Sequence, residues 1–212
     1  MRVTKYVHSC LLVEDEDSAV LFDPGQMSWE SRLCDVDKLQ RLDSIIITHE
    51  HFDHYYDLFV RALKDKFPDA EIITTPSLAE KLTAADFTNV KTSGTDKVEI
   101  VEAPHESMEP LAPPPMVQNI GVHYKGLLTH PGDSYHIAAS KKIFALPLAG
   151  PWGAAIDGVR LATKLKPDIV LPIHDWMWND FWRQDMYGRL QQYFYNLGIK
   201  FINFVDGEPV EL

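Results

Sequence analysis

Residues 48–57 read THEHFDHYYD and place three histidines and an aspartate within six positions. Histidines two residues apart point to opposite sides of a helix but share one face of an extended chain. His49 and His51 can therefore chelate one metal ion, while Asp53 and His54, where the chain turns towards a predicted helix, can bind at a second position nearby. Imidazole and carboxylate ligands without thiolates favour a catalytic metal site over a structural zinc site.

Further histidines and acids stand at the ends of other predicted strands. His105 follows KVEIVEAP, Asp133 follows LLTHPG, and His174 follows DIVLPI. A solvated polar loop that binds no metal would not require such residues after several separate strands. The pattern therefore favours a metal site assembled from distant parts of the chain.

The apolar periodicity predicts the elements that must position these residues. Strands are predicted within 10–13, 19–25, 44–51, 71–76, 97–104, 142–150 and 168–175, with a hairpin over 119–133 that turns near Lys125 and Gly126 and a closing strand pair over 200–212. Helices are predicted over 54–67, 77–85, 154–166 and 179–198. Strands come first and then alternate with helices in two comparable halves, which predicts an α/β fold of two mixed sheets with helices outside.

Composition limits the domain count and the partners. A chain of 212 residues with 45% hydrophobic residues predicts a single domain over 1–212. A net charge of −11 disfavours nucleic acid as a partner. No segment approaches the roughly 20 apolar residues that span a bilayer, and the start has no apolar signal segment, so a cytoplasmic protein with no membrane partner is expected.

The quoted motifs together resemble the metallo-β-lactamase superfamily over essentially the whole chain. The resemblance rests on THEHFDH, APHES, HPGDS and LPIHD in this order, with LFDPG upstream. It implies a four-layer αββα sandwich, in which two mixed sheets flanked by helices hold one or two metal ions. The short spacing is more similar to the small ascorbate-6-phosphate lactonase-like branch of metal-dependent hydrolases than to branches with large extra domains.

Carried over by position, the resemblance implies a complete ligand set for two divalent cations. The first cation would be held by His49, His51 and His105, the second by Asp53, His54 and His174, and Asp133 would bridge them. His130 and His136, three residues before and after Asp133, are alternative ligands. Zinc is the default metal for a histidine-rich site, with manganese and iron as alternatives.

Two such cations predict hydrolysis of a small-molecule substrate by a metal-bound hydroxide, because coordination lowers the pKa of water from about 16 towards 7. An ester, a lactone or a phosphorylated sugar derivative is expected, with Asp53 as a catalytic residue that takes the proton from the attacking water. A phosphodiesterase or nuclease with the same dinuclear site is one alternative. A metal-binding protein without catalysis is the other.

Several residues near the motifs have two interpretations. Asp23 in VLFDPG either orients the histidine loop or only stabilises an Asp-Pro-Gly turn. His8 either lies near the site, as the resemblance implies, or is a packed or exposed histidine beside a strand. Either an apolar substrate pocket or the core would account for Trp152, Trp176 and Trp178. Two further residues are expected at the surface, namely His123 and Asp175.

Overall fold

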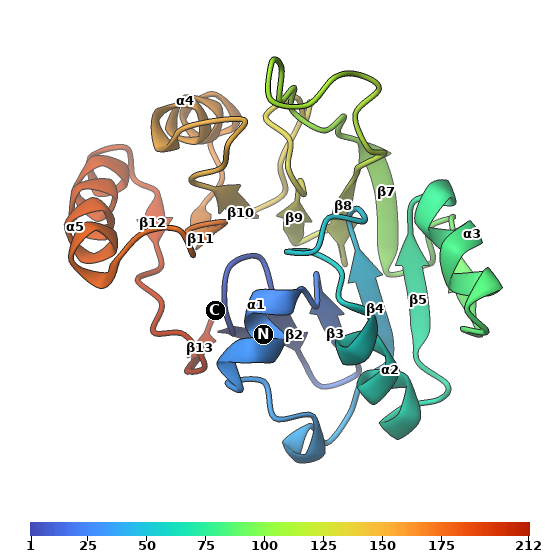
Figure 1. Cartoon of the computed structure of the whole chain (residues 1–212). Helices are drawn as coiled ribbons and strands as arrows, with labels where there is room; N and C mark the ends of the chain where they lie inside the picture. Colours follow the sequence, from blue (N-terminus) through green and yellow to red (C-terminus); the bar gives the residue numbers. More distant parts are fainter. The chain divides into compact units, whose positions relative to one another are not determined.

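The computed structural model describes all residues from 1 to 212 and forms two compact units. The first unit contains Met1–Gly94 and Val205–Leu212, and the second contains Thr95–Phe204. Each unit is built on one mixed sheet (Figure 1). A single domain over 1–212 stays a prediction.

The first unit contains a seven-stranded sheet in the order β13-β1-β2-β3-β4-β5-β6. Its strands β13, β1, β2 and β3 pair antiparallel, whereas β3, β4, β5 and β6 pair parallel. The bounds are β1 Arg2–Lys5, β2 Leu11–Glu14, β3 Ala19–Phe22, β4 Ser44–Ile47, β5 Glu71–Thr74, β6 Val90–Lys91 and β13 Pro209–Glu211.

Helices connect the parallel strands of the first unit. They are α1 (Gln26–Ser31), the 3-10 helix η1 (Val36–Lys38), α2 (Asp57–Lys66) and α3 (Pro76–Ala84). Ile45 and Ile47 share one face of β4 and belong to the same buried cluster as Phe59 and Leu63, which lie four residues apart on α2. This cluster fixes α2 against the sheet and therefore fixes the end of the loop between β4 and α2.

The second unit contains a six-stranded sheet in the order β12-β11-β10-β9-β8-β7. Its strands β7, β8 and β9 pair antiparallel, and β9, β10, β11 and β12 pair parallel. The bounds are β7 Val98–Glu102, β8 Ile120–Tyr124, β9 Leu128–His130, β10 Ile143–Pro147, β11 Ile169–Ile173 and β12 Lys200–Phe201.

Two helices cover the parallel part of the second sheet. Helix α4 (Ala155–Leu165) contacts β10, and α5 (Asp180–Asn196) contacts β12 (Figure 1). Their buried residues Ala162 and Phe194 join Phe144 and Leu146 of β10 in one cluster. The apolar stripe of α4 explains why the chain forms a helix there, and α5 packs through its buried residues Tyr187, Leu190 and Phe194. None of the helices in the structure combines the length and apolarity needed to cross a membrane.

The predicted α/β class, two mixed sheets flanked by helices, is confirmed. The hairpin at Lys125 and Gly126 is also confirmed, since both residues have the positive φ, 49° and 62°, of a tight turn. The prediction that two closing strands over 200–212 pair with each other is wrong. Strand β12 pairs with β11 and β13 pairs with β1, so the two segments belong to different sheets.

The start of α3 offers a test of local stability. The Thr75 hydroxyl accepts a hydrogen bond from the backbone N–H of Leu78 at 3.3 Å, which satisfies a donor that the helix itself leaves unpaired. Thr75→Ala should lower the free energy of unfolding by about 1 kcal/mol in urea titrations. Thr83→Ala on the exposed face of the same helix should lose no stability, because alanine has the higher helix propensity. Equal losses in the two variants would contradict the cap.

Candidate metal centre

All seven predicted ligands lie just beyond the carboxyl ends of strands, where α/β sheets place their binding loops. The first unit supplies what we call the first ligand set, which follows β4 and consists of His49, His51, Asp53 and His54. The second unit supplies the second ligand set, which follows β7, β9 and β11 and consists of His105, Asp133 and His174.

A fully buried carboxylate supports the first ligand set. Asp23 follows β3, and its Oδ1 accepts the backbone N–H of Thr48 at 2.8 Å. Its Oδ2 accepts the Thr48 hydroxyl at 3.0 Å and lies 2.7 Å from His54 Nδ1. Because Nδ1 donates to the carboxylate, Nε2 of His54 carries the lone pair that a metal ligand needs. Of the two interpretations of Asp23, the contacts favour the orienting role.

His49 and His51 have the arrangement expected of two ligands on an extended chain. Nε2 of His49 lies 3.1 Å from Nδ1 of His51, with the rings nearly perpendicular. Two nitrogens on one tetrahedral zinc lie about 3.3 Å apart, given Zn–N bonds of about 2.0–2.1 Å. The hydroxyl of Thr48 lies 3.1 Å from His49 Nδ1 and fixes the ring through the nitrogen that does not face His51. The donor pair therefore fits a divalent cation.

His8 lies beside the first ligand set, which favours the first of its two interpretations. It is buried, its φ is 62°, and its Nε2 is 3.1 Å from Oδ2 of Asp53. One ligand atom from each of His8, Asp53 and His54 lies within 4.8 Å of the others. The sequence offers little reason to choose this residue, because a single histidine after a strand forms no motif with the residues next to it.

The loop that carries the first ligand set packs tightly on the turn after β3. A Cβ added to Gly25 would lie 1.8 Å from the carbonyl oxygen of Asp53 and 2.9 Å from the backbone nitrogen of His54. The backbone N–H of Gln26 donates to the carbonyl of Phe52 at 2.8 Å, which joins the same two segments. Only a residue without a side chain lets the backbones approach this closely.

Backbone carbonyls orient both histidines of the second ligand set. Nδ1 of His105 donates to its neighbour's carbonyl, that of Glu106, at 2.7 Å, and Nδ1 of His174 donates to the carbonyl of Ala149. On each ring Nε2 then carries the lone pair. These Nε2 atoms lie 3.6 Å and 3.2 Å from Oδ2 of Asp133.

Asp133 is held by its neighbours from the backbone side and from the carboxylate side. Its backbone N–H donates to Oδ1 of Asn119 at 3.3 Å, and its carbonyl accepts the N–H of Glu106 at 2.9 Å. The indole N–H of Trp152 donates to Oδ2 at 2.9 Å. Of the three tryptophans considered for a substrate pocket, Trp152 lies beside the second ligand set, whereas Trp176 is exposed and Trp178 packs on the core cluster.

The two alternative ligands next to Asp133 do not join the second ligand set. Nδ1 of His130 accepts the backbone N–H of Gly132 at 3.2 Å, so this buried ring supports the turn. His136 is exposed, and its Nε2 faces the carboxylate of Glu106 at 3.5 Å.

Two residues expected at the surface are buried. The ring of His123 pairs with the hydroxyl of Thr129 at 2.8 Å, and desolvation lowers its pKa. Asp175 accepts the phenol of Tyr187. Both predictions were wrong, because each partner lies on a neighbouring strand or a distant helix that local periodicity does not reveal.

Tyr135 lies against the second ligand set as a neutral phenol. Burial, followed by the negative charges of Asp157, Glu106 and Asp133, raises its pKa well above the usual value. Its ring packs edge-on against Trp152, with centroids 5.2 Å apart. Tyr135 therefore places an uncharged aromatic ring, and no further negative charge, near Asp133.

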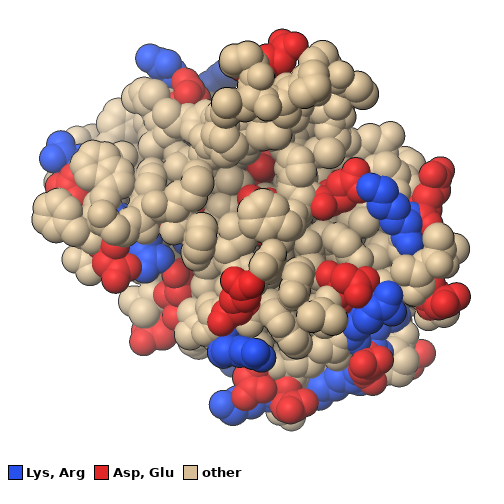
Figure 2. Space-filling model, viewed as in Figure 1, with Lys and Arg blue, Asp and Glu red and all other residues tan.

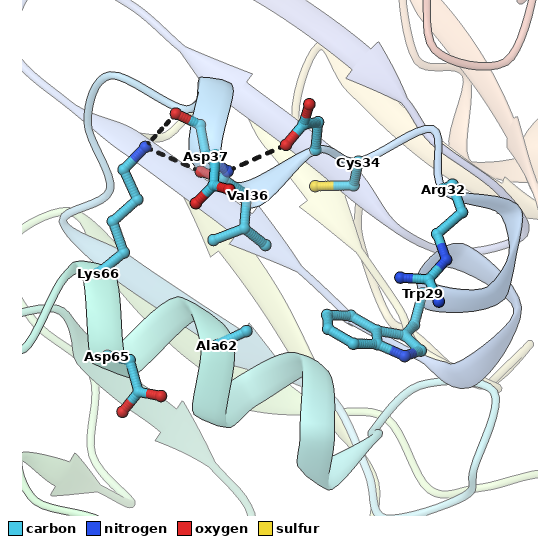
Figure 3. A pocket seen from close by; sticks show the side chains of 9 residues that line it. Trp29, Arg32, Cys34, Val36, Asp37, Ala62, Asp65 and Lys66 are labelled. Carbon is cyan, nitrogen blue, oxygen red and sulfur yellow. Dashed lines mark hydrogen bonds between the residues drawn. The ribbon is translucent and has the colours of Figure 1, made fainter.

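A separate pocket of about 620 Å³ lies in the first unit beside η1 and α2 (Figure 3). Lys66 spans one side by donating to the carbonyls of Val36 and Asp37 at 2.9 and 2.6 Å. Cys34 also lines it, and burial raises the pKa of this thiol to about 12, so the thiol stays neutral. The pocket has no histidine and none of the predicted ligands, so we assign it no metal chemistry.

The close contact at Gly25 leads to a stability prediction. Gly25→Ala should push the ligand loop away from the turn and lower the free energy of unfolding by roughly 1–3 kcal/mol, as overpacking does. Gly188→Ala is a matched control, because nothing lies within 4 Å of its added Cβ in α5 and alanine favours a helix. Urea titrations should show G25A less stable and G188A unchanged or more stable. A G25A variant as stable as the parent would contradict the packing described.

Comparisons with known proteins identify the family. Residues 2–174 match the family model described as "Beta-lactamase superfamily domain". Protein Rv0786c of Mycobacterium tuberculosis is 28% identical over 202 residues, which cover 91% of this chain and 92% of the relative. A UPF0173 metal-dependent hydrolase of Ignicoccus hospitalis is 25% identical over 196 residues, which cover 82% of each chain.

A solved structure shows the same fold. Igni18, described as a novel metallo hydrolase from Ignicoccus hospitalis, superimposes with a TM-score of 0.70 at 20% identity, covering 99% of this chain and 97% of that one. The family match over most of the chain confirms the resemblance carried by the histidine motifs. The chain therefore belongs to the metallo-β-lactamase superfamily.

Proposed function

We propose that this protein is a metal-dependent hydrolase that acts on a small-molecule ester, lactone or phosphorylated sugar derivative. The observation that carries the proposal is that hydrogen bonds fix which ring nitrogen of the ligand histidines bears the proton. His54, His105 and His174 each engage Nδ1 with a buried carboxylate or a backbone carbonyl. The enzyme class, a metal-dependent hydrolase, is also the one named for relatives and structural neighbours.

The two ligand sets provide the donors for two divalent cations in this proposal. His49, His51 and His105 would hold one cation, Asp53, His54 and His174 would hold the other, and Asp133 would be a ligand of both. Zinc suits these nitrogen and oxygen donors, and manganese and iron are the alternatives to test. Bound divalent cations lower the pKa of coordinated water and polarise a carbonyl or phosphoryl oxygen.

In this proposal, two carboxylates of the first unit have separate roles, one in accepting a proton and one in orienting a ligand. Asp53 is the proposed proton acceptor from the attacking water, and Nε2 of His8 at 3.1 Å holds its Oδ2. Asp23 keeps the proton of His54 on Nδ1 through their 2.7 Å contact. The chain thus supplies one carboxylate to move a proton and another to hold one in place.

The charge distribution supports a small molecule over a nucleic acid. On the face drawn in Figure 2, Lys and Arg stand beside Asp and Glu, with no broad area of basic side chains alone. The chain carries 31 acidic and 20 basic residues, so a phosphate backbone would meet net repulsion.

Metal analysis and a substrate screen test the proposal. Protein purified without added metal should contain or take up divalent metal, by elemental analysis. The metal-loaded protein should hydrolyse at least one compound in a panel of lactones, phosphoesters and bis-aryl phosphodiesters, and a chelator should abolish turnover. His51→Ala should lower turnover by at least 100-fold with the fold intact. His136→Ala, at an exposed side chain, should keep turnover within twofold.

Each contrary result has a distinct meaning. Folded protein that takes up no metal would refute the proposal. Metal uptake with no turnover on any substrate class would favour a binding protein without catalysis. Turnover limited to phosphodiesters or RNA would favour the phosphodiesterase or nuclease alternative.

The proton role of Asp53 makes a separate prediction. Asp53→Asn keeps one oxygen donor but removes the basic group, so it should lower kcat at least 100-fold while leaving KM within a few-fold. Elemental analysis of the same preparation should find the metal retained. A variant that loses metal in parallel with kcat would assign Asp53 to metal binding alone.

A further inference from the structure

The loop after β10 contacts two members of the second ligand set. The backbone N–H of Leu148 donates to the carbonyl of Ile173, the last residue of β11, at 3.0 Å. The N–H of Ala149 donates to the carbonyl of His174 at 2.9 Å. The carbonyl of Ala149 accepts Nδ1 of His174, and the indole of Trp152 donates to Asp133. One short segment, AGPWG, therefore holds a histidine and a carboxylate at once.

The shape of this loop places the indole with little freedom. Gly150 and Gly153 exchange backbone hydrogen bonds at 3.1 and 3.3 Å, which closes the loop. A Cβ added to Gly150 would lie 2.6 Å from the Trp152 ring, so the absence of a side chain at Gly150 leaves room for the indole. The ring is further bounded edge-on by His174 and Tyr135, with centroids 5.0 and 5.2 Å away.

The contact itself has a defined chemical direction. An indole N–H only donates, so Oδ2 of Asp133 must accept the 2.9 Å hydrogen bond. Hydrogen bonds to a carboxylate are stronger than those between neutral groups, and they restrict the rotation of the carboxylate. The oxygen held in this way is the one that faces Nε2 of His105 and of His174 at 3.6 and 3.2 Å.

We propose that Trp152 is a positioning residue that acts through Asp133. Its N–H orients Oδ2 of Asp133 towards Nε2 of His105 and Nε2 of His174 and thereby raises the affinity of the site for divalent metal. This inference rests on the proposed metal centre. It assigns the indole a polar function in addition to its packing against Tyr135 and His174.

Replacement by phenylalanine separates the polar function from packing. Trp152→Phe retains an aromatic ring but no donor, and Trp182→Phe makes the same change at a half-exposed position on α5. Zinc and manganese affinities are measured by competition with a chromogenic chelator, which requires no substrate. W152F should bind at least tenfold more weakly, as expected when a group that supports a metal ligand is lost, and W182F should stay within twofold of the parent.

A double-mutant cycle tests whether the effect passes through the carboxylate. Asp133→Ala weakens metal binding by itself, and adding W152F to D133A should cause less than a further twofold loss, because the acceptor of the indole hydrogen bond is already gone. A purely structural role would give the same loss in both backgrounds. Thermal unfolding of each metal-free variant shows whether the fold is kept.

The outcomes separate this inference from the proposed function. A parent protein that binds no metal would refute the metal centre. A parent that binds metal, with W152F binding equally well or with additive losses in the cycle, would overturn the role of Trp152. If W152F does not fold, Gly150→Ala provides the second variant, since its Cβ displaces the indole while Trp152 remains. Unchanged metal affinity in G150A would likewise overturn it.

Discussion

Burial of the Asp23 carboxylate is the constraint on which the first ligand set depends. Removing a carboxylate from water costs several kcal/mol unless hydrogen bonds replace the lost solvation. Here the backbone N–H and hydroxyl of Thr48 and the ring of His54 replace it. Any movement of the histidine loop would break one of these bonds and leave a buried charge less well solvated. The loop therefore keeps one geometry, and His54 keeps one tautomer.

The second ligand set achieves the same control with neutral acceptors. His105 and His174 donate to backbone carbonyls, and both carbonyls belong to loops that pair with neighbouring segments. Because the acceptors carry no charge, this arrangement avoids the desolvation cost that Asp23 imposes. The acidic group in this set is the ligand Asp133, whose carboxylate accepts the indole N–H of Trp152 and whose backbone N–H donates to Oδ1 of Asn119. Charge thus lies with the ligand rather than with its support.

Much of the fold could be predicted from the sequence, and the seven candidate ligands could be proposed from it, because both rest on local patterns. Isoleucine-rich β4 and the apolar stripe of α2 specify a strand and a helix, and the histidine motif lies where one gives way to the other. The closing segments failed for a non-local reason. β12 and β13 are consecutive strands, but their partners β11 and β1 lie in different sheets, and no spacing within residues 200–212 encodes that choice.

The supporting residues were harder to predict than the ligands, and the difference is physical. A metal ligand must be a histidine, an acid or a cysteine, so residue type narrows the search. A group that orients a ligand needs only a hydrogen-bonding atom, and backbone carbonyls such as that of Ala149 supply one without any sequence requirement. His8 lies 45 residues from Asp53, and Trp152 lies 19 from Asp133. Such pairs are fixed by where strand ends meet within each sheet, so tertiary structure alone assigns them their partners.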